Sequence, residues 1–531
     1  MKNCPWSRGG IVLGAFLFLF AAQLARLPDL ASLTRIDYDQ LFQLALGLKA
    51  SHGAWPGLDF FTNYGPGVAV LSALSWCWHN PILAETITGA LLSSIGVLAF
   101  WLAGRTPGSP FRNTLLFATL LFAAPIWAKY YYLLWPGLFL LTLGDPAADQ
   151  APRAQNLRWL LLGVIIGLGG WFRLEIGLAL TAALAGALVV RWRAIPATTP
   201  RPLTLAGYAT VGALTPWLIY FGAAWLVRGH PQGTWDLIDF YFTSTLAKTS
   251  DFHSFDVVPR RATYLGAESI ACVLGVAVGL SALLVLVFCF PRARSSVAGT
   301  ALTRRAWCAA WLLLCLSPQA LHRIDSYHTL QVVASGLVAV ALGLSCLLQR
   351  SGSSAPARFT RLHSRAALVA FGVLVVISGR IYFKTSPDLA HAVPRLRSLA
   401  AGLPSLDQST PDAVLAAELR RRTAETGTIL IPSLDARFYV LAGRPFAGLV
   451  PHWSFRLPER WVERQLASLH AEPAALVAYA DYLRSENAPQ WLRQLDFKGR
   501  NPRLDAYVDK TYPDTVYQNP YWRILAPAGS P

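Results

Sequence analysis

Two acidic residues, Asp37 and Asp39, lie in the stretch LTRIDYDQLF at residues 33–42, shortly after an apolar run that is long enough to cross a membrane. Apolar residues at helical spacing follow, so the sequence predicts a helix that begins near Asp37. Asp37 would cap this helix, Gln40 would complete a capping box, and Asp39 would complement the helix dipole. Capping explains both acids without chemistry, but a carboxylate at a helix N-terminus is also well oriented to accept a proton. The pattern leaves both roles open.

A second polar stretch, WPGLDFFTNYGPG at residues 55–67, has Pro-Gly turns on either side of Asp59 and Tyr64. One interpretation is an interfacial loop anchored by its aromatic side chains. The other is a lid or wall of a substrate groove.

Charged residues also lie close to the ends of apolar runs further along the chain. Lys129 precedes three tyrosines in AKYYYLLWPG, and Arg173 and Glu175 lie in GWFRLEIG between two back-to-back apolar runs. Ionisable groups near membrane depth are costly and are usually paired or functional. Arg173 and Glu175 could form a structural pair, but residues i and i+2 of a helix diverge, so separate partners are the favoured interpretation.

The stretch QALHRIDSYHTLQ contains His322, Arg323, Asp325 and His328. Their irregular spacing makes a metal site a weak hypothesis. Arg323 between histidines fits a phosphate better, because a guanidinium matches phosphate oxygens in a bidentate manner. Simple solvation at a membrane interface explains the cluster equally well.

Familiar catalytic motifs are absent from the sequence. GxxxxGK[ST], GxGxxG after a strand, GxSxG and HExxH do not occur, which argues against nucleotide hydrolysis and a serine hydrolase. The seven cysteines lie in or beside apolar segments without metal-ligand spacing, as expected for small buried side chains.

The composition is that of a polytopic membrane protein. Of 531 residues, 54% are hydrophobic and only 14% are charged, whereas a soluble protein carries about 25% charged residues. Apolar runs recur up to residue 383, and four short basic segments between them are typical of cytoplasmic loops. Because these loops carry much of the net charge of +17, they argue against nucleic-acid binding. About eleven crossings are predicted, at 11–27, 84–103, 113–128, 131–144, 157–172, 174–190, 204–227, 264–290, 306–320, 329–348 and 366–383.

This topology places the N-terminus in the cytoplasm and residues 384–531 outside it. Residues 64–82 must then form a juxtamembrane or re-entrant helix, because another crossing would invert the basic loops. Of the 14 acids before residue 384, only Asp145 and Asp149 fall inside, so the extracytoplasmic side is predicted to be the polar working face. Longer outer loops could also account for this asymmetry.

The composition changes near residue 384, where charge becomes mixed and proline more frequent. ELRRRTAETGTILIPSLDARFYVLAGR predicts a helix, a short buried strand at TILIP and a further helix or turn, and YWRILAP predicts a closing strand. We therefore expect a mainly α-helical membrane domain at 1–383 and a small extracytoplasmic α/β domain at 384–531.

Taken together, the sequence resembles the GT-C superfamily of integral-membrane glycosyltransferases, especially bacterial protein O-mannosyltransferases and lipid A aminoarabinose transferases. The resemblance rests on RIDYDQLFQLALGL after a first span, on PGLDFFTNYGPG, on a non-spanning helix, and on DARFYVLAGRP. It covers mainly residues 10–200.

The resemblance implies a multi-pass protein of the bacterial cytoplasmic (inner) membrane that moves a sugar, with inversion, from a polyprenyl-phosphate donor to a hydroxyl of a glycan, lipid or protein outside the cytoplasm. Asp37 matches the proposed general base of the family. Lys129, Arg173 and Arg323 are candidates for binding the leaving phosphate, with His322 beside Arg323. Asp59, Tyr64 and Glu175 would shape a substrate groove, and Asp39 would support Asp37 or bind a metal.

The sequence departs from the family pattern at two points. Many relatives carry Asp-Glu in the first loop, but here Tyr38 separates Asp37 from Asp39, and the loop containing AKYYYLL lacks the usual second acid. These departures put a requirement for a divalent cation, Mg²⁺ or Mn²⁺, in doubt, and they leave Glu175 as the candidate stand-in for the second acid.

Two other functions are open to a polytopic protein of this composition. A transporter or flippase predicts internal repeats and acids at mid-span, neither of which is evident. A polymerase or ligase of lipid-linked glycans predicts a long loop between late spans, and residues 228–263 keep that reading open.

Overall fold

A computed structural model of the chain describes residues 6–24, 38–62, 64–105, 110–123, 129–143, 152–192, 202–229, 235–243, 297–322, 334–343, 345, 397, 411–433, 435–453, 457–480 and 501–529. The chain forms two compact units, and the division between them falls inside two long helices. Unit 1 comprises Met1–Arg26, Thr88–Tyr220 and Ser254–Ala392. Unit 2 comprises Leu27–Ile87, Phe221–His253 and Val393–Pro531, so it contains more than the predicted C-terminal domain.

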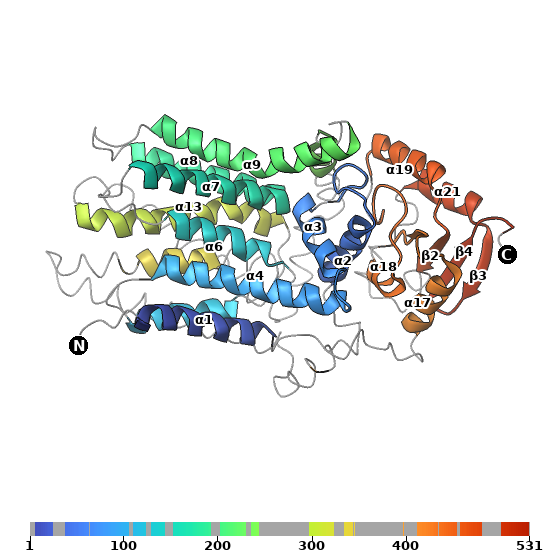
Figure 1. Ribbon diagram of the computed structural model, residues 1–531, viewed down its shortest axis with the longest axis horizontal. Helices are drawn as coiled ribbons and strands as arrows, with labels where there is room; N and C mark the ends of the chain where they lie inside the picture. The colour runs from blue at the N-terminus through green and yellow to red at the C-terminus, as the bar shows by residue number, and fades with distance from the viewer. Residues whose placement is uncertain are drawn as a thin grey trace. The chain divides into compact units, whose positions relative to one another are not determined.

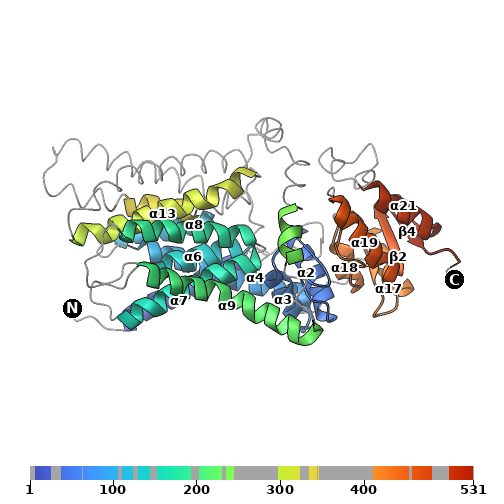
Figure 2. The same ribbon diagram turned by 90° about the horizontal axis from the view of Figure 1, so that it is seen from above.

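The regular secondary structure of unit 1, within the described residues, is entirely α-helical. Helices α6, α7, α8 and α13 run alongside one another in both views (Figures 1 and 2). Helices that lie wholly or partly in this unit include α1 (Trp6–Leu24), α4 (Pro81–Gly104), α5 (Pro110–Ala123), α6 (Tyr131–Leu143), α7 (Pro152–Phe172), α8 (Leu174–Trp192), α9 (Pro202–Arg228), α13 (Val297–His322) and the helix Ala334–Gly343.

Glycines allow these helices to approach one another closely. Gly163 and Gly167 of α7 face α9 so closely that a methyl group on them would lie 2.0 Å from the carbonyl oxygen of Ala209 and 2.3 Å from that of Ala213. Small residues four apart permit such backbone contact between membrane helices. The chain therefore packs α7 on α9 by shape, without polar side chains at these points.

Two helices within the described residues, Pro81–Gly104 and Leu203–Arg228, are long and apolar enough to cross a membrane. Shorter apolar helices include Tyr131–Leu143 and Leu174–Val189. The predicted crossings at 264–290 and 366–383 lie outside the described residues, so the count of eleven stays a prediction.

In unit 2, α2 (Tyr38–Ser51) packs on α3 (Pro66–Ser75). The contact is backbone to backbone, because a methyl group on Gly47 would lie 2.5 Å from the carbonyl carbon of Ser72. With ten residues, α3 is about 15 Å long and too short to cross a bilayer. A short helix in the predicted 64–82 segment is thus confirmed, while its place at a membrane surface stays a prediction.

The C-terminal part of unit 2 contains a four-stranded mixed sheet with strand order β1-β2-β4-β3. β1 is parallel to β2, and the other two pairs are antiparallel. On its other edge, β1 forms a bridge between Ile429 and Phe446. The elements are α17 (Pro411–Arg422), β1 (Ile429–Leu430), α18 (Arg437–Ala442), α19 (Glu459–Ala471), β2 (Leu476–Ala480), α21 (Pro502–Thr511), β3 (Asp514–Gln518) and β4 (Trp522–Ala526). The predicted helix, TILIP strand, second helix and closing strand are all present.

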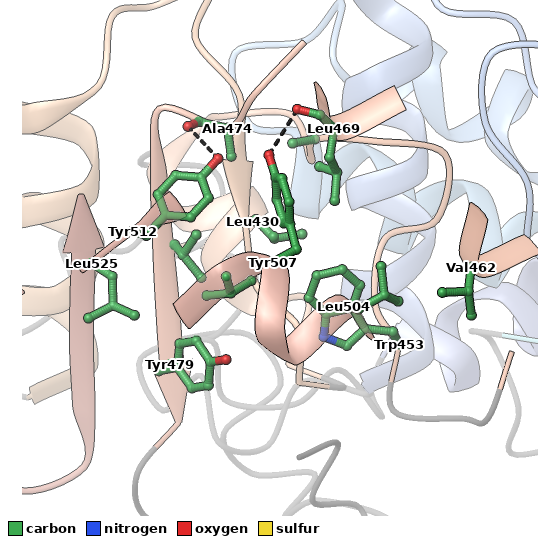
Figure 3. Close-up of a cluster of buried hydrophobic side chains, with 13 residues drawn as sticks. Leu430, Trp453, Val462, Leu469, Ala474, Tyr479, Leu504, Tyr507, Tyr512 and Leu525 are labelled. Atoms are coloured by element: carbon green, nitrogen blue, oxygen red, sulfur yellow. Dashed lines mark hydrogen bonds between the residues drawn. The ribbon is translucent and has the colours of Figure 1, made fainter. Parts of the chain in front are cut away.

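A hydrophobic core lies between this sheet and the helices α19 and α21 (Figure 3). Two tyrosines of the core satisfy their hydroxyls on the backbone: Tyr507 donates to the Leu469 carbonyl at 2.9 Å and Tyr512 to the Ala474 carbonyl at 3.0 Å. Buried hydroxyls are costly unless they are hydrogen-bonded in this way. The core therefore gives this part of the unit a fixed scaffold.

Aromatic rings and ion pairs join the helix at 235–243 to α19. Arg464 pairs with Asp236 at 2.9 Å, and Arg460 pairs with Asp239. The Trp461 ring lies 4.8 Å from the rings of both Phe61 and Phe240. The helix at 235–243 is the described part of the 228–263 loop, on which the polymerase or ligase alternative depends. Its two aspartates form ion pairs with α19.

Candidate functional site

Asp39 and Tyr64 are brought together by the packing of α2. Asp39 lies in the first turn of α2, and the Tyr64 hydroxyl donates to its Oδ1 at 2.7 Å. Tyr64 is 8% exposed and Asp39 is half-buried. Asp37 directly precedes the first residue of α2 but lies outside the described residues, so its predicted roles as cap and base stay predictions. Within the described residues, the site therefore consists of the Asp39 carboxylate held by the Tyr64 hydroxyl.

The helix that carries Asp39 is itself held by polar contacts. Gln40 donates from Nε2 to Thr86 Oγ1 at 2.6 Å, at the start of α4. Trp76, just after α3, donates from its indole nitrogen to the Leu44 carbonyl at 2.9 Å. Buried, directional contacts of this kind set the rotation of α2, and they hold its first turn in place.

Glu85 is a further buried acid that the sequence did not single out as a site residue. It lies in α4 and accepts hydrogen bonds from Ser72 at 2.9 Å and from Ser75 at 2.8 Å. Both serines belong to α3, so this carboxylate joins α3 to α4. The only signal in the sequence was an acid in an apolar run, which does not reveal its partners.

Asp59 closes the loop in which it lies. Its Oδ2 accepts from the Trp55 amide at 2.7 Å and pairs with Arg228 at 2.6 Å. Gly57 in the same turn has a φ of +80°, a conformation that strongly favours glycine. The contacts shown are those of a residue that shapes the loop.

In unit 1, Arg173 and Glu175 contact each other directly. Arg173 donates from Nε to Glu175 Oε1 at 2.6 Å, and the Tyr132 hydroxyl donates to the same oxygen at 3.2 Å. The expectation of separate partners was wrong, because the i, i+2 rule applies inside a helix. Arg173 lies in the break between α7 and α8, where the chain can turn its side chain toward Glu175.

Lys129 lies in the turn that begins α6 and is only 6% exposed. Its carbonyl accepts from the Tyr132 amide at 3.0 Å. The neighbouring Tyr130 ring lies 6.1 Å from the ring of Phe172, the last residue of α7. The start of α6 and the end of α7 therefore bring two cations, Lys129 and Arg173, to the same end of these helices.

The other predicted site residues are described only in part. His322 is the last residue of α13, and Arg323 lies outside the described residues. Within the part of the chain that is described, no group of three His, Cys, Asp or Glu side chains could hold a metal ion.

No protein-family model matches the chain, and no curated protein matches it. Among solved structures, apo ArnT from Cupriavidus metallidurans is similar over 99% of this chain and 98% of that chain, with a TM-score of 0.51 and 13% identity. ArnT from the same organism bound to undecaprenyl phosphate gives a TM-score of 0.48 at 13% identity and covers 99% of both chains. The apo oligosaccharyltransferase of Archaeoglobus fulgidus gives 0.38 at 12% identity, covering 91% of this chain and 72% of that one.

The first of these matches shows the fold. The chain has the fold of ArnT over nearly its whole length. The resemblance to GT-C proteins that the sequence suggested is therefore confirmed at the level of the fold.

Proposed function

We propose that the chain is an integral-membrane glycosyltransferase that transfers a sugar from a polyprenyl-phosphate donor to an acceptor hydroxyl outside the cytoplasm, with inversion at the sugar carbon. The observation that carries the proposal is the Asp39–Tyr64 contact at the first turn of α2 in a chain with the ArnT fold. A carboxylate held in this way at a helix N-terminus marks the place where a proton acceptor is well oriented.

Asp37 takes the acceptor proton as the hydroxyl oxygen attacks the anomeric carbon. The new glycosidic bond forms on the face opposite the phosphate, and the carbon–phosphate oxygen bond breaks. A single displacement inverts the configuration and needs one base, whereas a retaining enzyme needs a second carboxylate as nucleophile. Tyr64 fixes Asp39, and Asp39 in turn supports the position of Asp37 two residues earlier.

The leaving phosphate gains negative charge as this bond breaks, so it requires a cationic partner. Arg173 and Lys129 supply cations at one end of the unit 1 helices, and Arg323 is the third candidate. The Glu175 carboxylate and the Tyr132 hydroxyl hold the Arg173 guanidinium in one orientation. A guanidinium held in one orientation is well suited to a phosphate, because its planar fork matches phosphate oxygens.

The test is sugar transfer by the purified full chain in lipid nanodiscs. A panel of synthetic polyprenyl-phosphate hexoses and pentoses is combined with alkyl glycosides, lipid A and a serine- and threonine-containing peptide as acceptors. Asp37→Asn is expected to lower the rate by about 10²–10⁴-fold, the usual contribution of a general base. Asp509→Asn, at an exposed position of α21, is the matched control and should retain the wild-type rate.

Full activity of Asp37→Asn would exclude Asp37 as the base. Movement of the lipid-linked sugar across the nanodisc or a vesicle bilayer without any transfer would favour a flippase and contradict the proposal. Joining of one lipid-linked glycan to another, with no reaction of simple hydroxyl acceptors, would favour the polymerase or ligase alternative.

A further inference from the structure

One face of α2 runs along the segment 446–453 of the C-terminal region. Phe42 and Lys49 are seven residues apart and therefore lie on the same side of the helix, two turns from each other. Lys49 donates from Nζ to the carbonyls of Phe446 at 2.9 Å and Gly448 at 2.5 Å. The Phe42 ring lies 5.4 Å from the His452 ring. Lys49, near the end of α2, contacts the start of the segment, and Phe42, two turns earlier, contacts its end.

The contacts of Lys49 are unusual for a lysine. Its ammonium lies 4.3 Å from the centre of the Phe446 ring and 5.9 Å from that of Phe60, at cation–π distance. Its hydrogen bonds shown here go to two backbone carbonyls. An amine keeps at least two N–H donors whether or not it is protonated, so it can serve both carbonyls in either state.

Hydrogen bonds also fix the backbone on both sides of His452. The partners are Phe61 of the loop before α3, Gln465 of α19, Tyr439 of α18 and Pro432 of the loop after β1. The pairs are Phe61 N to Leu449 O at 2.7 Å, Leu449 N and Val450 N to Gln465 Oε1 at 2.7 and 3.1 Å, Tyr439 Oη to Pro451 O at 2.8 Å, and Trp453 N to Pro432 O at 3.2 Å. His452 itself stays partly exposed. The Nδ1 atom of His452 is buried, so the exposed part of the ring is the remainder, and a backbone held this firmly gives the ring a defined position.

That position is next to the candidate site. Asp39 lies one helical turn before Phe42 on α2, and the Phe42 ring lies 5.7 Å from the ring of Tyr64. One buried phenyl ring therefore contacts both His452 and the tyrosine that donates to Asp39. Residues more than 380 positions apart in the sequence meet at this point.

We infer that Lys49 is a positioning residue that fastens the 446–453 segment to α2, and that His452 contacts the acceptor substrate beside Asp39 and Tyr64. The inference rests on the proposed glycosyltransferase function and adds the acceptor contact to it. An imidazole can both donate and accept a hydrogen bond. It fits a hydroxyl-rich acceptor, such as a glycan, that offers a second polar group near the attacked hydroxyl.

The positioning role is tested without turnover, by hydrogen–deuterium exchange of the full chain in nanodiscs. Lys49→Met removes both donors and leaves the Phe446 and Gly448 carbonyls without them, so peptides covering 446–453 should exchange about tenfold faster. Lys49→Arg, which keeps N–H donors, should give an intermediate rate. Lys510→Met, at an exposed position of α21, is the control and should match wild type. Equal exchange in Lys49→Met and wild type would overturn the positioning role.

The acceptor contact is tested with the donor and acceptor pair that gives the fastest transfer in the panel above. His452→Phe keeps an aromatic ring on Phe42 but loses the hydrogen bonds, so the acceptor KM should rise about tenfold. The donor KM should change less than twofold, and His452→Gln should recover part of the loss. His470 packs edge-on against Tyr507 at 4.9 Å, so His470→Phe is a matched control that should leave both KM values unchanged.

An unchanged acceptor KM in His452→Phe, or an equal rise in both KM values, would show that His452 only packs against Phe42 and would overturn its role. Failure of the wild-type chain to transfer any sugar contradicts the proposed function and the acceptor contact together. The exchange experiment then still decides whether Lys49 fastens the segment. The two failures are therefore distinguishable.

Discussion

The polar clusters of the two units are assembled in opposite ways. Arg173 and Glu175 in unit 1 are two residues apart and meet because the chain breaks between α7 and α8. Lys49 and Phe446 in unit 2 are 397 residues apart and meet because α2 packs on the C-terminal region. In the first cluster a cation contacts a carboxylate, and in the second it contacts carbonyls and aromatic rings. A local break can thus orient a charge by itself, whereas a long-range contact joins two segments that would otherwise be independent.

The largest effect is expected at the Arg173–Glu175 pair of unit 1. Arg173→Met should lower the rate of sugar transfer by about 10²–10³-fold, the cost of removing one donor to a developing anion. It also leaves the Glu175 carboxylate without its cation, so stability should fall as well. Initial rates and thermal unfolding of the full chain measure the two effects.

The double variant Arg173→Met with Glu175→Gln separates these effects. If Arg173 binds phosphate, the double variant should regain stability but not activity. Recovery of transfer in the double variant would show that the pair is only structural, and the local cluster would then have no part in the chemistry.

Tyr64→Phe tests whether the carboxylate in unit 2 needs its phenol. The change removes one hydrogen bond to a charged group, worth about 1.5–3 kcal/mol, so kcat/KM should fall by about 10–100-fold. The phenyl ring keeps its packing against Phe42, so the loss of unfolding free energy should be no larger than that of this one hydrogen bond, and the rates are compared at a temperature where both proteins are folded. Tyr521→Phe, at an exposed position, is the control. A wild-type kcat/KM in Tyr64→Phe would remove Asp39 from the proposed supporting role.

Gly163→Ala tests whether unit 1 depends on close helix contact. The added methyl group would meet the carbonyl oxygen of Ala209 on α9, and such overpacking costs about 1–3 kcal/mol. Gly207→Ala on α9 meets nothing within 4 Å, so it should be neutral or slightly stabilising because alanine favours helix formation. Thermal unfolding in nanodiscs compares the two variants. Equal stability would show that α7 and α9 are free to separate by the width of a methyl group.

The pH dependence of stability tests the contacts of Lys49. Burial lowers the pKa of Lys49 from 10.5 to about 8, although the carboxylates of Glu472 and Asp59 act in the opposite direction. Between these values the unfolded amine holds a proton that the folded one has released. Stability should therefore rise with pH across this window, by at most about 1.4 kcal/mol per pH unit.

The measurement is the difference in unfolding free energy between wild type and Lys49→Met at several pH values from 7.5 to 10. The variant lacks this group, so the difference should grow in favour of wild type as the pH rises. A flat or falling difference would show that the lysine is solvated in the folded chain.

Local pattern predicted many of the elements correctly. The break between α7 and α8, the short helix α3 and the succession α17, β1, α18 all follow from apolar spacing and turn residues close together in the sequence. The Arg173–Glu175 pair was the less favoured interpretation, because helix geometry was applied across a break in the helix. The Lys49 and His452 contacts carry no local signal, because their partners lie in a different part of the chain. Asp37 and Arg323 lie outside the described residues, so their roles stay predictions.

The edge of the sheet at β1 bears on whether the C-terminal region would stay soluble as an isolated fragment. The Ile429 amide donates to the Pro445 carbonyl and the Ala447 amide donates to the Ile429 carbonyl, so the chain seals this edge with its own backbone. A sealed edge cannot recruit a strand from another molecule, which protects against aggregation. The seal is held by Lys49, however, so a fragment cut free of α2 loses that support and exposes the Phe446 ring. We expect such a fragment to self-associate, and a soluble version to require residues 38–87 as a companion.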